Sequence, residues 1–363
     1  MNTTTKYAAT ALAAALGVGV LAGCGADDEA GGTGSKGSKT VTLVSHDSFN
    51  ASDAVLKAFT KETGYTVKVL KSGDAGAALN QEILTKGSPR GDVFFGADNT
   101  LLSRALDHGL FTPYEAKGLD RVAESAQLDA DEHRVTPVDT GDICVNYDKK
   151  YFADKKLDPP NSFDDLLDPE YKNLLVTENA ATSSPGLGFL LGTVATYGEN
   201  GYQDYWKKLK SNGVKVVDGW EQAYNEEFSG SAGGKKAKAD RPLVVSYASS
   251  PPVEVLYADP QPTEAPTGVA TATCFRQIEF AGLLDGAKNE AGGKALLDFL
   301  ISKRFQEDMP LTMFVNPVVK DAKLPELFTK FGATVDEPAT VAPEKIAKNR
   351  EQWVQSWSSL VVK

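Results

Sequence analysis

Four segments of the chain combine hydroxyl, small and acidic side chains where a β-prone run ends and a helix-prone run begins. Free N–H groups at a helix N-terminus carry partial positive charge, and neighbouring serine or glycine suits a phosphate or carboxylate. Ordinary helix capping and turn formation use the same residue types and are the alternative interpretation of each segment. The four segments are His46-Asp47-Ser48-Phe49, Gly73-Asp74-Ala75-Gly76, Gly96-Ala97-Asp98-Asn99 and Thr182-Ser183-Ser184-Pro185-Gly186.

Aromatic residues occupy comparable places in the sequence. Trp220 comes shortly after one predicted strand, Tyr247 ends another, and Phe314 lies between two prolines. Aromatic faces combined with a carboxylate suit a flat cationic ring. Ordinary packing in the core is the alternative for each of these side chains.

Sequence motifs for catalysis or metal binding are missing. The three histidines, His46, His108 and His133, are far apart, and the chain contains no HExxH helix, zinc-type Cys/His spacing, Walker loop or GxSxG elbow. A triad assembled from distant residues stays open as an alternative. We therefore predict a protein that is not an enzyme, with no catalytic residue, no cofactor and no metal site.

Strands and helices alternate along the chain and would position the polar segments. From Thr40 to Gly109 strand and helix alternate three times, which argues for a mostly parallel sheet with helices on both faces. Asn50 or Ser52 can cap the first helix, and Asn99 the third. A second α/β series follows. Strands are predicted at 41–44, 67–70, 92–95, 143–147, 174–176, 214–217 and 243–247, and helices at 52–61, 77–87, 100–109, 162–168, 186–198, 220–228, 294–302 and 343–359.

Two extended segments, near 140–147 and 271–280, join the two series. We therefore predict an α/β fold of two lobes, in which the cleft between the lobes is the natural ligand site. A proline-bounded loop is expected at 310–317. The predicted parts are lobe 1 at 40–142 plus 277–318, lobe 2 at 143–276, and a C-terminal helical segment at 319–363 that packs on the lobes.

The first 39 residues resemble an export signal followed by a linker. Residues 7–22 are apolar and uncharged, Lys6 precedes them, and the run is too short for a comfortable transmembrane helix. The run ends in Leu21-Ala22-Gly23-Cys24, which looks like a bacterial lipobox, so we predict a lipoprotein signal peptide at 1–23 and lipidation of Cys24. An ordinary secretory signal with an incidental cysteine is the alternative. The Gly/Ser/Asp-rich stretch that completes 24–39 is predicted to be a flexible tether.

The charge balance restricts the possible partners. The formal net charge is −11, and the predicted signal peptide carries a single positive side chain, so the remainder is more acidic still. An acidic surface disfavours nucleic acid and anionic membrane surfaces and is compatible with attracting a small cation. We expect no nucleic-acid partner.

With these segments the chain resembles the thiamine-binding receptors of bacterial ABC transporters, within the wider family of periplasmic iron, polyamine and thiamine binding proteins. The resemblance extends from about Val41 to Trp357. Three of its segments, at 182–191, 219–224 and 246–251, are fairly specific to the thiamine branch. The segments that carry it are HDSF (46–49), GADNTLL (96–102), VNYDKK (145–150), TSSPGLGFLL (182–191), DGWEQAY (218–224), SYASSP (246–251) and NREQWVQSW (349–357).

The resemblance implies a periplasmic-binding-protein-like fold whose two lobes are hinged by two strands and close on the ligand. It implies that loop 46–49 helps to hold an aminopyrimidine, and that Asp74, Ser183 and Trp220 lie near the phosphate or hydroxyethyl end. Tyr247 and the loop at 313–316 would lie along the ring system. The full set of expected ligand-binding residues is His46, Asp47, Ser48, Asp74, Ala75, Gly76, Asp98, Asn99, Ser183, Ser184, Trp220, Tyr224, Tyr247, Ser249, Phe314 and Asn316.

The chain also departs from the pattern of its relatives. Some relatives have Tyr in place of His46, Trp in place of Phe314 and Tyr in place of Val253, so the stacking walls would be smaller here. Histidine can also stack on a ring, but a protonated histidine repels a cation. These departures bear on affinity and on the choice between free thiamine and its phosphates.

Two cysteines remain once Cys24 is assigned to lipid. Outside the cytoplasm Cys144 and Cys274 can form a disulfide or stay as thiols. The resemblance places them on the two neighbouring hinge strands, which implies a disulfide across the hinge if the Cα atoms lie within about 7 Å. Two buried free thiols are the alternative.

The resemblance implies the following function. A monomer anchored through Cys24 on the outer face of the cytoplasmic membrane would capture thiamine or a thiamine phosphate and deliver it to an ABC permease and its ATPase. Two alternatives remain open: the same fold with ferric ion, a polyamine or a phosphonate as ligand, and a secreted enzyme that processes thiamine phosphate.

Overall fold

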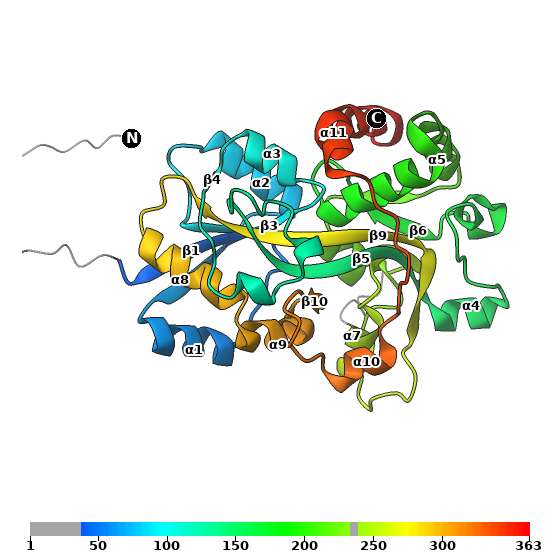
Figure 1. Ribbon diagram of the computed structural model, residues 1–363. Coiled ribbons are helices and arrows are strands. Elements are labelled where there is room, and N and C mark those ends of the chain that lie inside the picture. Colours follow the sequence, from blue (N-terminus) through cyan, green and yellow to red (C-terminus); the bar gives the residue numbers. More distant parts are fainter. Residues whose placement is uncertain (1–37, 233–238) are drawn as a thin grey trace, which may run out of the picture. The chain divides into compact units, whose positions relative to one another are not determined.

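The computed structural model describes residues 38–232 and 239–363 (Figure 1). The predicted signal peptide, Cys24 and nearly all of the predicted tether lie outside the described residues. Within the described parts of the chain, no helix is both long enough and apolar enough to cross a membrane.

One mixed sheet runs through the whole body, in the strand order β2-β1-β3-β9-β5-β8-β6-β7, with β4 added to β9 and β10 added to β5. The three strands β1 to β3 are parallel, as the sequence predicts, whereas β9 and β5 are antiparallel to their neighbours. The strands are β1 (Thr40–Ser45), β2 (Thr66–Lys71), β3 (Val93–Asp98), β4 (Phe111–Thr112), β5 (Thr136–Asp148), β6 (Leu175–Glu178), β7 (Lys215–Val217), β8 (Leu243–Tyr247), β9 (Thr267–Leu284) and β10 (Asn316–Pro317).

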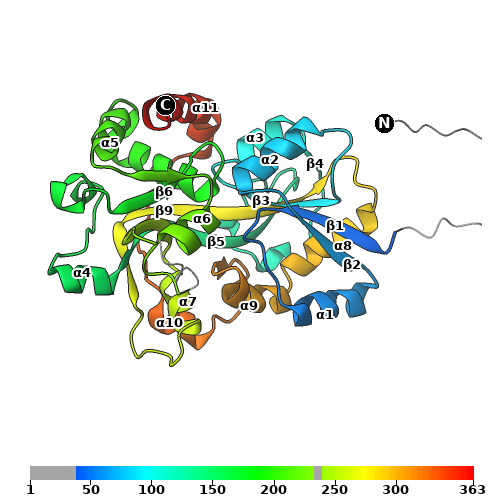
Figure 2. The same ribbon diagram turned by 180° about the vertical axis from the view of Figure 1, so that it is seen from behind.

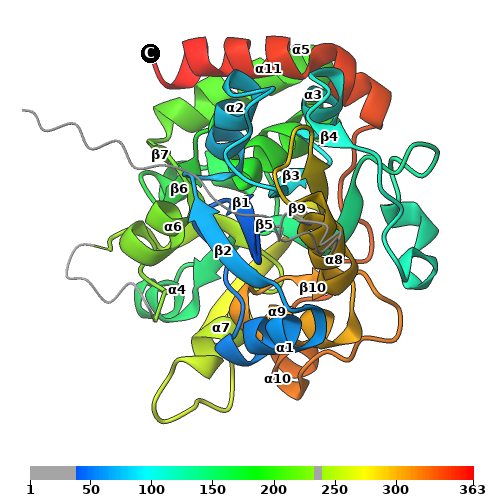
Figure 3. The same ribbon diagram turned by 90° about the vertical axis from the view of Figure 1, so that its left-hand side faces the viewer.

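Helices cover both faces of this sheet (Figures 1 and 2). Seen along the sheet, α2 and α3 lie on one side of the β1–β3 strands and α1, α8 and α9 on the other (Figure 3). The helices are α1 (Asp53–Thr63), α2 (Ala75–Leu84), α3 (Leu102–Asp107), α4 (Lys149–Lys155), α5 (Ser184–Ser211), α6 (Trp220–Gln222), α7 (Pro251–Leu256), α8 (Glu290–Leu300), α9 (Lys303–Thr312), α10 (Glu326–Phe331) and α11 (Pro343–Val361).

The two long strands β5 and β9 connect the two lobes. They pair antiparallel from Thr136 opposite Ala281 to Asp148 opposite Thr267, and the register shifts between Ile143 and Val145. We call lobe 1 the elements on the β2 side of this pair and lobe 2 the elements on the β7 side. The predicted α/β fold of two lobes with two connecting strands is confirmed. The residue limits predicted for the lobes stay a proposal.

A disulfide joins the connecting strands where their register shifts. Cys144 of β5 and Cys274 of β9 are bonded, with their Cα atoms 4.2 Å apart. Ala248 packs against both cysteines in a small apolar cluster of its own. The bond therefore ties the two strands at the boundary between the lobes.

Local sequence signals explain most helix limits. Ser52 caps α1 through the N–H of Val55, and Gly64 ends that helix with φ 76°. Serine and glycine are favoured at these two positions because serine accepts from a free N–H and glycine adopts positive φ without strain.

Two local predictions are wrong. Asn99 does not cap a helix: its amide binds the backbone of β9 at Arg276 and Ile278, and α3 begins only at Leu102. The expected loop at 310–317 is helical over its first three residues, because α9 continues through Pro310 to Thr312. The hydrogen bond that proline cannot donate is therefore given up inside α9.

The C-terminal helix α11 packs against both lobes, on α5 and on α3. Its Trp357 is fully buried and meets Trp206 of α5 edge to face, with ring centroids 5.4 Å apart. Figure 1 shows α11 lying over α5. The burial of these two large rings fixes the end of the chain to the body.

Candidate ligand-binding cleft

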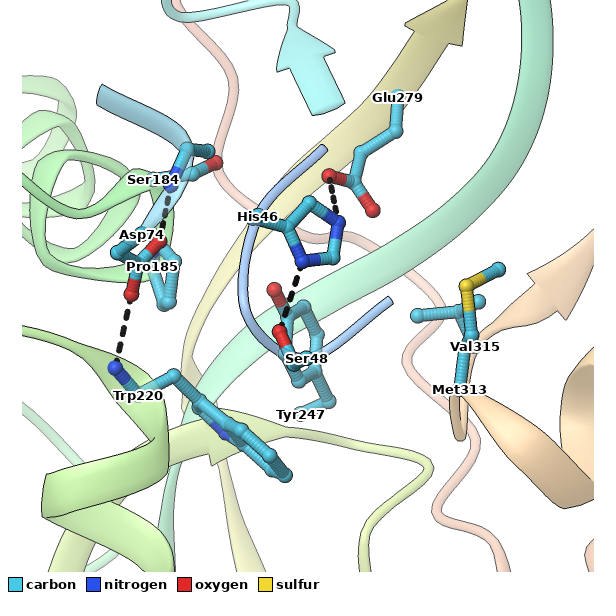
Figure 4. A pocket seen from close by; sticks show the side chains of 11 residues that line it. His46, Ser48, Asp74, Ser184, Pro185, Trp220, Tyr247, Glu279, Met313 and Val315 are labelled. Atoms are coloured by element: carbon cyan, nitrogen blue, oxygen red, sulfur yellow. Dashed lines mark hydrogen bonds and ion pairs between the residues drawn. The ribbon is translucent and has the colours of Figure 1, made fainter. Parts of the chain in front are cut away.

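A cavity lies where the two lobes face each other (Figure 4). Loops that follow β1 and β7, the N-termini of α2 and α5, and the end of β8 supply most of its lining. Strand β9 and the segment after α9 supply the remainder. The lining residues are His46, Ser48, Asp74, Ala75, Ser184, Pro185, Trp220, Tyr247, Glu279, Met313 and Val315.

The lobes are close together at the centre of this cleft. The free volume there is about 30 Å³, which is the space of about one water molecule. Two larger hollows of about 360 Å³ and 460 Å³ adjoin it, and both share Ser48 and Trp220 with the central cavity. The cleft is therefore narrow at its centre and wider in these two adjoining hollows.

The Asp74 carboxylate connects the lobes. It caps α2 of lobe 1 by accepting from the N–H of Ala75 at 2.6 Å. From lobe 2 it accepts the N–H of Trp220 at 2.8 Å, and it also accepts from the N–H of Ser184 and from Ser183. Burial raises the pKa of Asp74, while these hydrogen bonds act to lower it. Three helix N-termini thus share one acidic group.

A second set of contacts crosses the cleft beside Asp74. The Ser184 hydroxyl donates to the buried Asp98 carboxylate of β3, and the Gln277 amide donates to Ser184 at 2.7 Å and to Asp98 at 3.1 Å. The backbones also approach closely, because a Cβ added to Gly76 would lie 2.8 Å from the carbonyl oxygen of Thr182. Only glycine permits this approach between α2 and lobe 2.

Aromatic side chains form one wall of the cleft. Trp220 stacks on Tyr224, with ring centroids 5.0 Å apart and planes 13° from parallel, and its indole N–H donates to Ser246 at 2.9 Å. Tyr247 also lines the central cavity, where burial raises the pKa of its hydroxyl well above the usual value. Both rings are therefore held in place, and Tyr247 is neutral.

His46 is held as a neutral ring. Its Nδ1 is hydrogen-bonded to the Ser48 hydroxyl at 2.8 Å. Burial, with a smaller contribution from the charge of Lys71, lowers its pKa to about 4. Its Nε2 lies 3.6 Å from a Glu279 oxygen and has no hydrogen-bond partner. At neutral pH His46 therefore does not repel a cation.

The buried carboxyl group of Glu279 lines the cavity, and a second buried carboxyl group lies beside it. Glu279 of β9 lies directly opposite Asp139 of β5, and both are buried. Burial raises the pKa of Asp139 to about 7. Burial, and then the charge of Asp139, raises the pKa of Glu279 well above its usual value. In the part of the chain that the structure describes, no group of three or more His, Cys, Asp or Glu residues could hold a metal ion.

The chain is similar to known proteins over most of its length. The family described as bacterial extracellular solute-binding protein matches residues 88–247. The thiamine-binding periplasmic protein of Brucella suis biovar 1 (strain 1330) is 29% identical over 327 residues, covering 88% of this chain and 91% of that protein. The thiamine-binding periplasmic protein of Escherichia coli (strain K12) is 28% identical over 332 residues, covering 88% of this chain and 93% of its own.

Solved structures of binding proteins also superpose on this chain over most of its length. A periplasmic thiamin binding protein superposes with a TM-score of 0.74 at 27% identity, covering 89% of this chain and 96% of that one. The ferric binding protein from Campylobacter jejuni superposes with a TM-score of 0.70 at 18% identity, covering 88% of this chain and 99% of that one, which shows the fold alone.

The structure brings most of the predicted site residues together. Seven line the central cavity, three line the flanking hollows, and four are buried directly behind the lining. In that order they are His46, Ser48, Asp74, Ala75, Ser184, Trp220 and Tyr247; then Asp47, Tyr224 and Phe314; then Gly76, Asp98, Ser183 and Ser249.

Two predicted residues lie elsewhere in the structure. Asn316 pairs with Thr140 in the sheet, and Asn99 lines a separate hollow of about 590 Å³ together with Thr140, Arg276 and Ile278. Successive side chains of a strand point to opposite faces of the sheet. Thr140 of β5 and Arg276 and Ile278 of β9 therefore face away from the cleft. Closeness in sequence to Asp98 and Phe314 does not bring Asn99 and Asn316 into the cavity.

Sequence reasoning missed Glu279. A signal for it exists, because Gln277 and Glu279 are two positions apart in a β-prone run and therefore share one face of the strand. Polar side chains in such a pair are uncommon on a buried strand face unless they have a partner. Met313 and Val315, which also line the cavity, belong to the loop 313–316 that the resemblance places along the ring system, although neither is in the set of expected ligand-binding residues.

Proposed function

We propose that this protein captures thiamine or a thiamine phosphate outside the cytoplasm and delivers it to an ABC importer. The observation that carries the proposal is the cleft itself, in which aromatic rings and buried carboxyl groups face each other. Aromatic faces and carboxylates are what a flat cationic ring requires. The similarity to thiamine-binding proteins over 88% of the chain supports the same ligand.

The mechanism is a hinge motion without chemistry on the ligand. The ligand enters while the lobes are apart, and the contacts of Asp74 and Ser184 across the cleft form as the lobes close. A ligand shifts this equilibrium only by as much as it binds the closed form more tightly. The closed monomer then docks on the permease, whose ATPase drives import.

We further propose that Cys24 carries the lipid anchor, so that the protein stays on the outer face of the cytoplasmic membrane. The sequence before Cys24 supports this proposal. Cells that produce the full chain would be fractionated and the membrane-bound protein measured. A Cys24→Ala change is expected to release the protein from the membrane fraction, and unchanged retention would contradict the anchor.

A fluorescence titration tests the ligand. Binding near Trp220 is expected to change the tryptophan emission of the purified protein with thiamine, its monophosphate or its diphosphate, and to saturate at one ligand per chain. Ferric ion, spermidine and 2-aminoethylphosphonate would be titrated in parallel. A response to one of these and none to any thiamine form would replace thiamine by that ligand. Recovery of altered thiamine after incubation would indicate an enzyme.

A further inference from the structure

The Glu279 carboxyl has an unusual environment in the cleft. Glu279 is 5% exposed and lines the central cavity. Figure 4 shows its side chain pointing at His46. The distance of 3.6 Å to His46 Nε2 is too long for a hydrogen bond. His46 Nε2 and Gln277 Oε1 are both buried without a partner. Buried polar atoms usually have partners, so these two indicate a place for a ligand.

The groups that face Glu279 are acidic or neutral. Asp139 lies opposite it on β5, Asp98 approaches from β3, and Asp74 approaches from α2. The two neutral neighbours are His46 from the β1 loop and the Tyr247 hydroxyl from β8. Lys71 acts on His46, but its ammonium group donates to the Asp47 carbonyl at the surface. No cation therefore balances Glu279 from within the described cleft.

Such a pair of carboxyl groups holds at least one proton when the cleft is empty. Two like charges cannot both persist side by side in a buried site, and the pair titrates as a unit. Burial raises the pKa of both groups, which favours the doubly protonated, uncharged pair in the empty cleft.

We propose that Glu279 is the counter-charge for the cationic ring of the ligand, and that the arriving cation displaces a proton from the Glu279–Asp139 pair into solvent. This inference rests on the proposed function. The pair holds two protons before the ligand binds. One carboxyl O–H bond breaks, that proton goes to the buffer and the other stays, so the pair then carries one negative charge that faces the ligand's positive charge. A thiazolium ring has no N–H to donate, so a carboxylate and aromatic faces are the groups able to recognise it.

Calorimetry in two buffers tests this exchange. Thiamine is titrated into the full protein at pH 7 in phosphate and in Tris, whose ionisation enthalpies differ, so that the difference in observed heat counts the protons released. Wild type is expected to release up to about one proton per ligand. Glu279→Gln keeps the shape of the side chain and is expected to release no proton. It is also expected to bind thiamine about ten- to a hundredfold more weakly, because a ligand that lowers the pKa of the carboxyl pair by about one to two units gains that factor in affinity.

Two controls isolate the charge. Glu221→Gln removes an exposed carboxylate from the rim of the same cleft and is expected to change neither the affinity nor the proton count. A neutral thiamine analogue with a thiophene ring in place of thiazolium is expected to bind Glu279→Gln and wild type equally. A melting temperature of Glu279→Gln no lower than that of wild type would exclude a folding defect.

The outcomes separate the two proposals. Thiamine binding by wild type with no proton release, and equal affinity of Glu279→Gln, overturns the role of Glu279 and leaves the proposed function intact. A loss of affinity that extends equally to the neutral analogue also overturns it, because the effect is then not one of charge. Absence of thiamine binding by wild type overturns both.

Discussion

The contacts of Asp74 across the cleft predict a large effect of the single change Asp74→Asn. Asparagine still caps α2, because its side-chain oxygen can accept from the N–H of Ala75. It has one acceptor oxygen instead of two, so its amide group faces the N–H of Trp220 and both groups are donors. The change therefore weakens closure while it preserves lobe 1.

The magnitude follows from the bonds that are lost. A hydrogen bond to a charged acceptor contributes about 1.5–3 kcal/mol. Trp220 and Ser184 each donate one from lobe 2, and part of their contribution is offset because Asp74 is desolvated on closure. We expect a net loss of about 2–3 kcal/mol in the closed form, which weakens thiamine binding by about thirty- to a hundred-and-fortyfold.

Small-angle X-ray scattering with and without thiamine measures this effect. The empty Asp74→Asn variant is expected to be more open than empty wild type, and saturating thiamine is expected to close both. Asp218→Asn at the exposed rim is the matched control and is expected to behave as wild type. Identical scattering and identical affinity of Asp74→Asn and wild type would refute the role of Asp74 in closure.

Three further outcomes are expected. Burial raises the pKa of Glu279 in the folded state, so its contribution to stability falls as pH rises above the usual value of 4.5. The melting-temperature difference between Glu279→Gln and wild type should therefore widen as pH rises, and a constant difference would contradict this. Replacement of both Cys144 and Cys274 by serine removes a disulfide between residues 130 positions apart, and should lower the free energy of unfolding measured by urea titration by about 2–5 kcal/mol. An unchanged urea concentration at the unfolding midpoint would show that the disulfide does not stabilise the fold. Gly76→Ala places a methyl group against the Thr182 carbonyl and should weaken thiamine binding at least about tenfold with no loss of melting temperature; unaltered affinity would show that the lobes need not approach so closely.

Periodicity and capping residues predict the fold of this chain well. The runs at 41–44, 67–70 and 92–95 all become strands, and Ser52 and Gly64 limit α1 as expected. These features depend on neighbours in sequence. The antiparallel pairing of β9 with β3 and β5 depends on contacts between distant residues, and strand propensity alone does not specify it.

The candidate site is predictable where a loop is fixed by the end of a strand. Asp74 and Trp220 were found in this way, because both directly precede or begin a helix at the cleft edge. Glu279 lies within a strand, and its role depends on the register with Asp139, which sequence does not reveal. Asn99 does follow the end of a strand, but its side chain binds the backbone of the sheet and does not enter the cavity.

Equilibrium dialysis with radiolabelled thiamine tests the central claim most directly, because it requires no optical signal and no change of shape. The purified protein is expected to retain one thiamine per chain at saturation, to lose it to unlabelled thiamine but not to spermidine, and to bind it far more weakly after Trp220→Ala. Retention no greater than that of an unrelated acidic protein, at every concentration tried, would contradict the account.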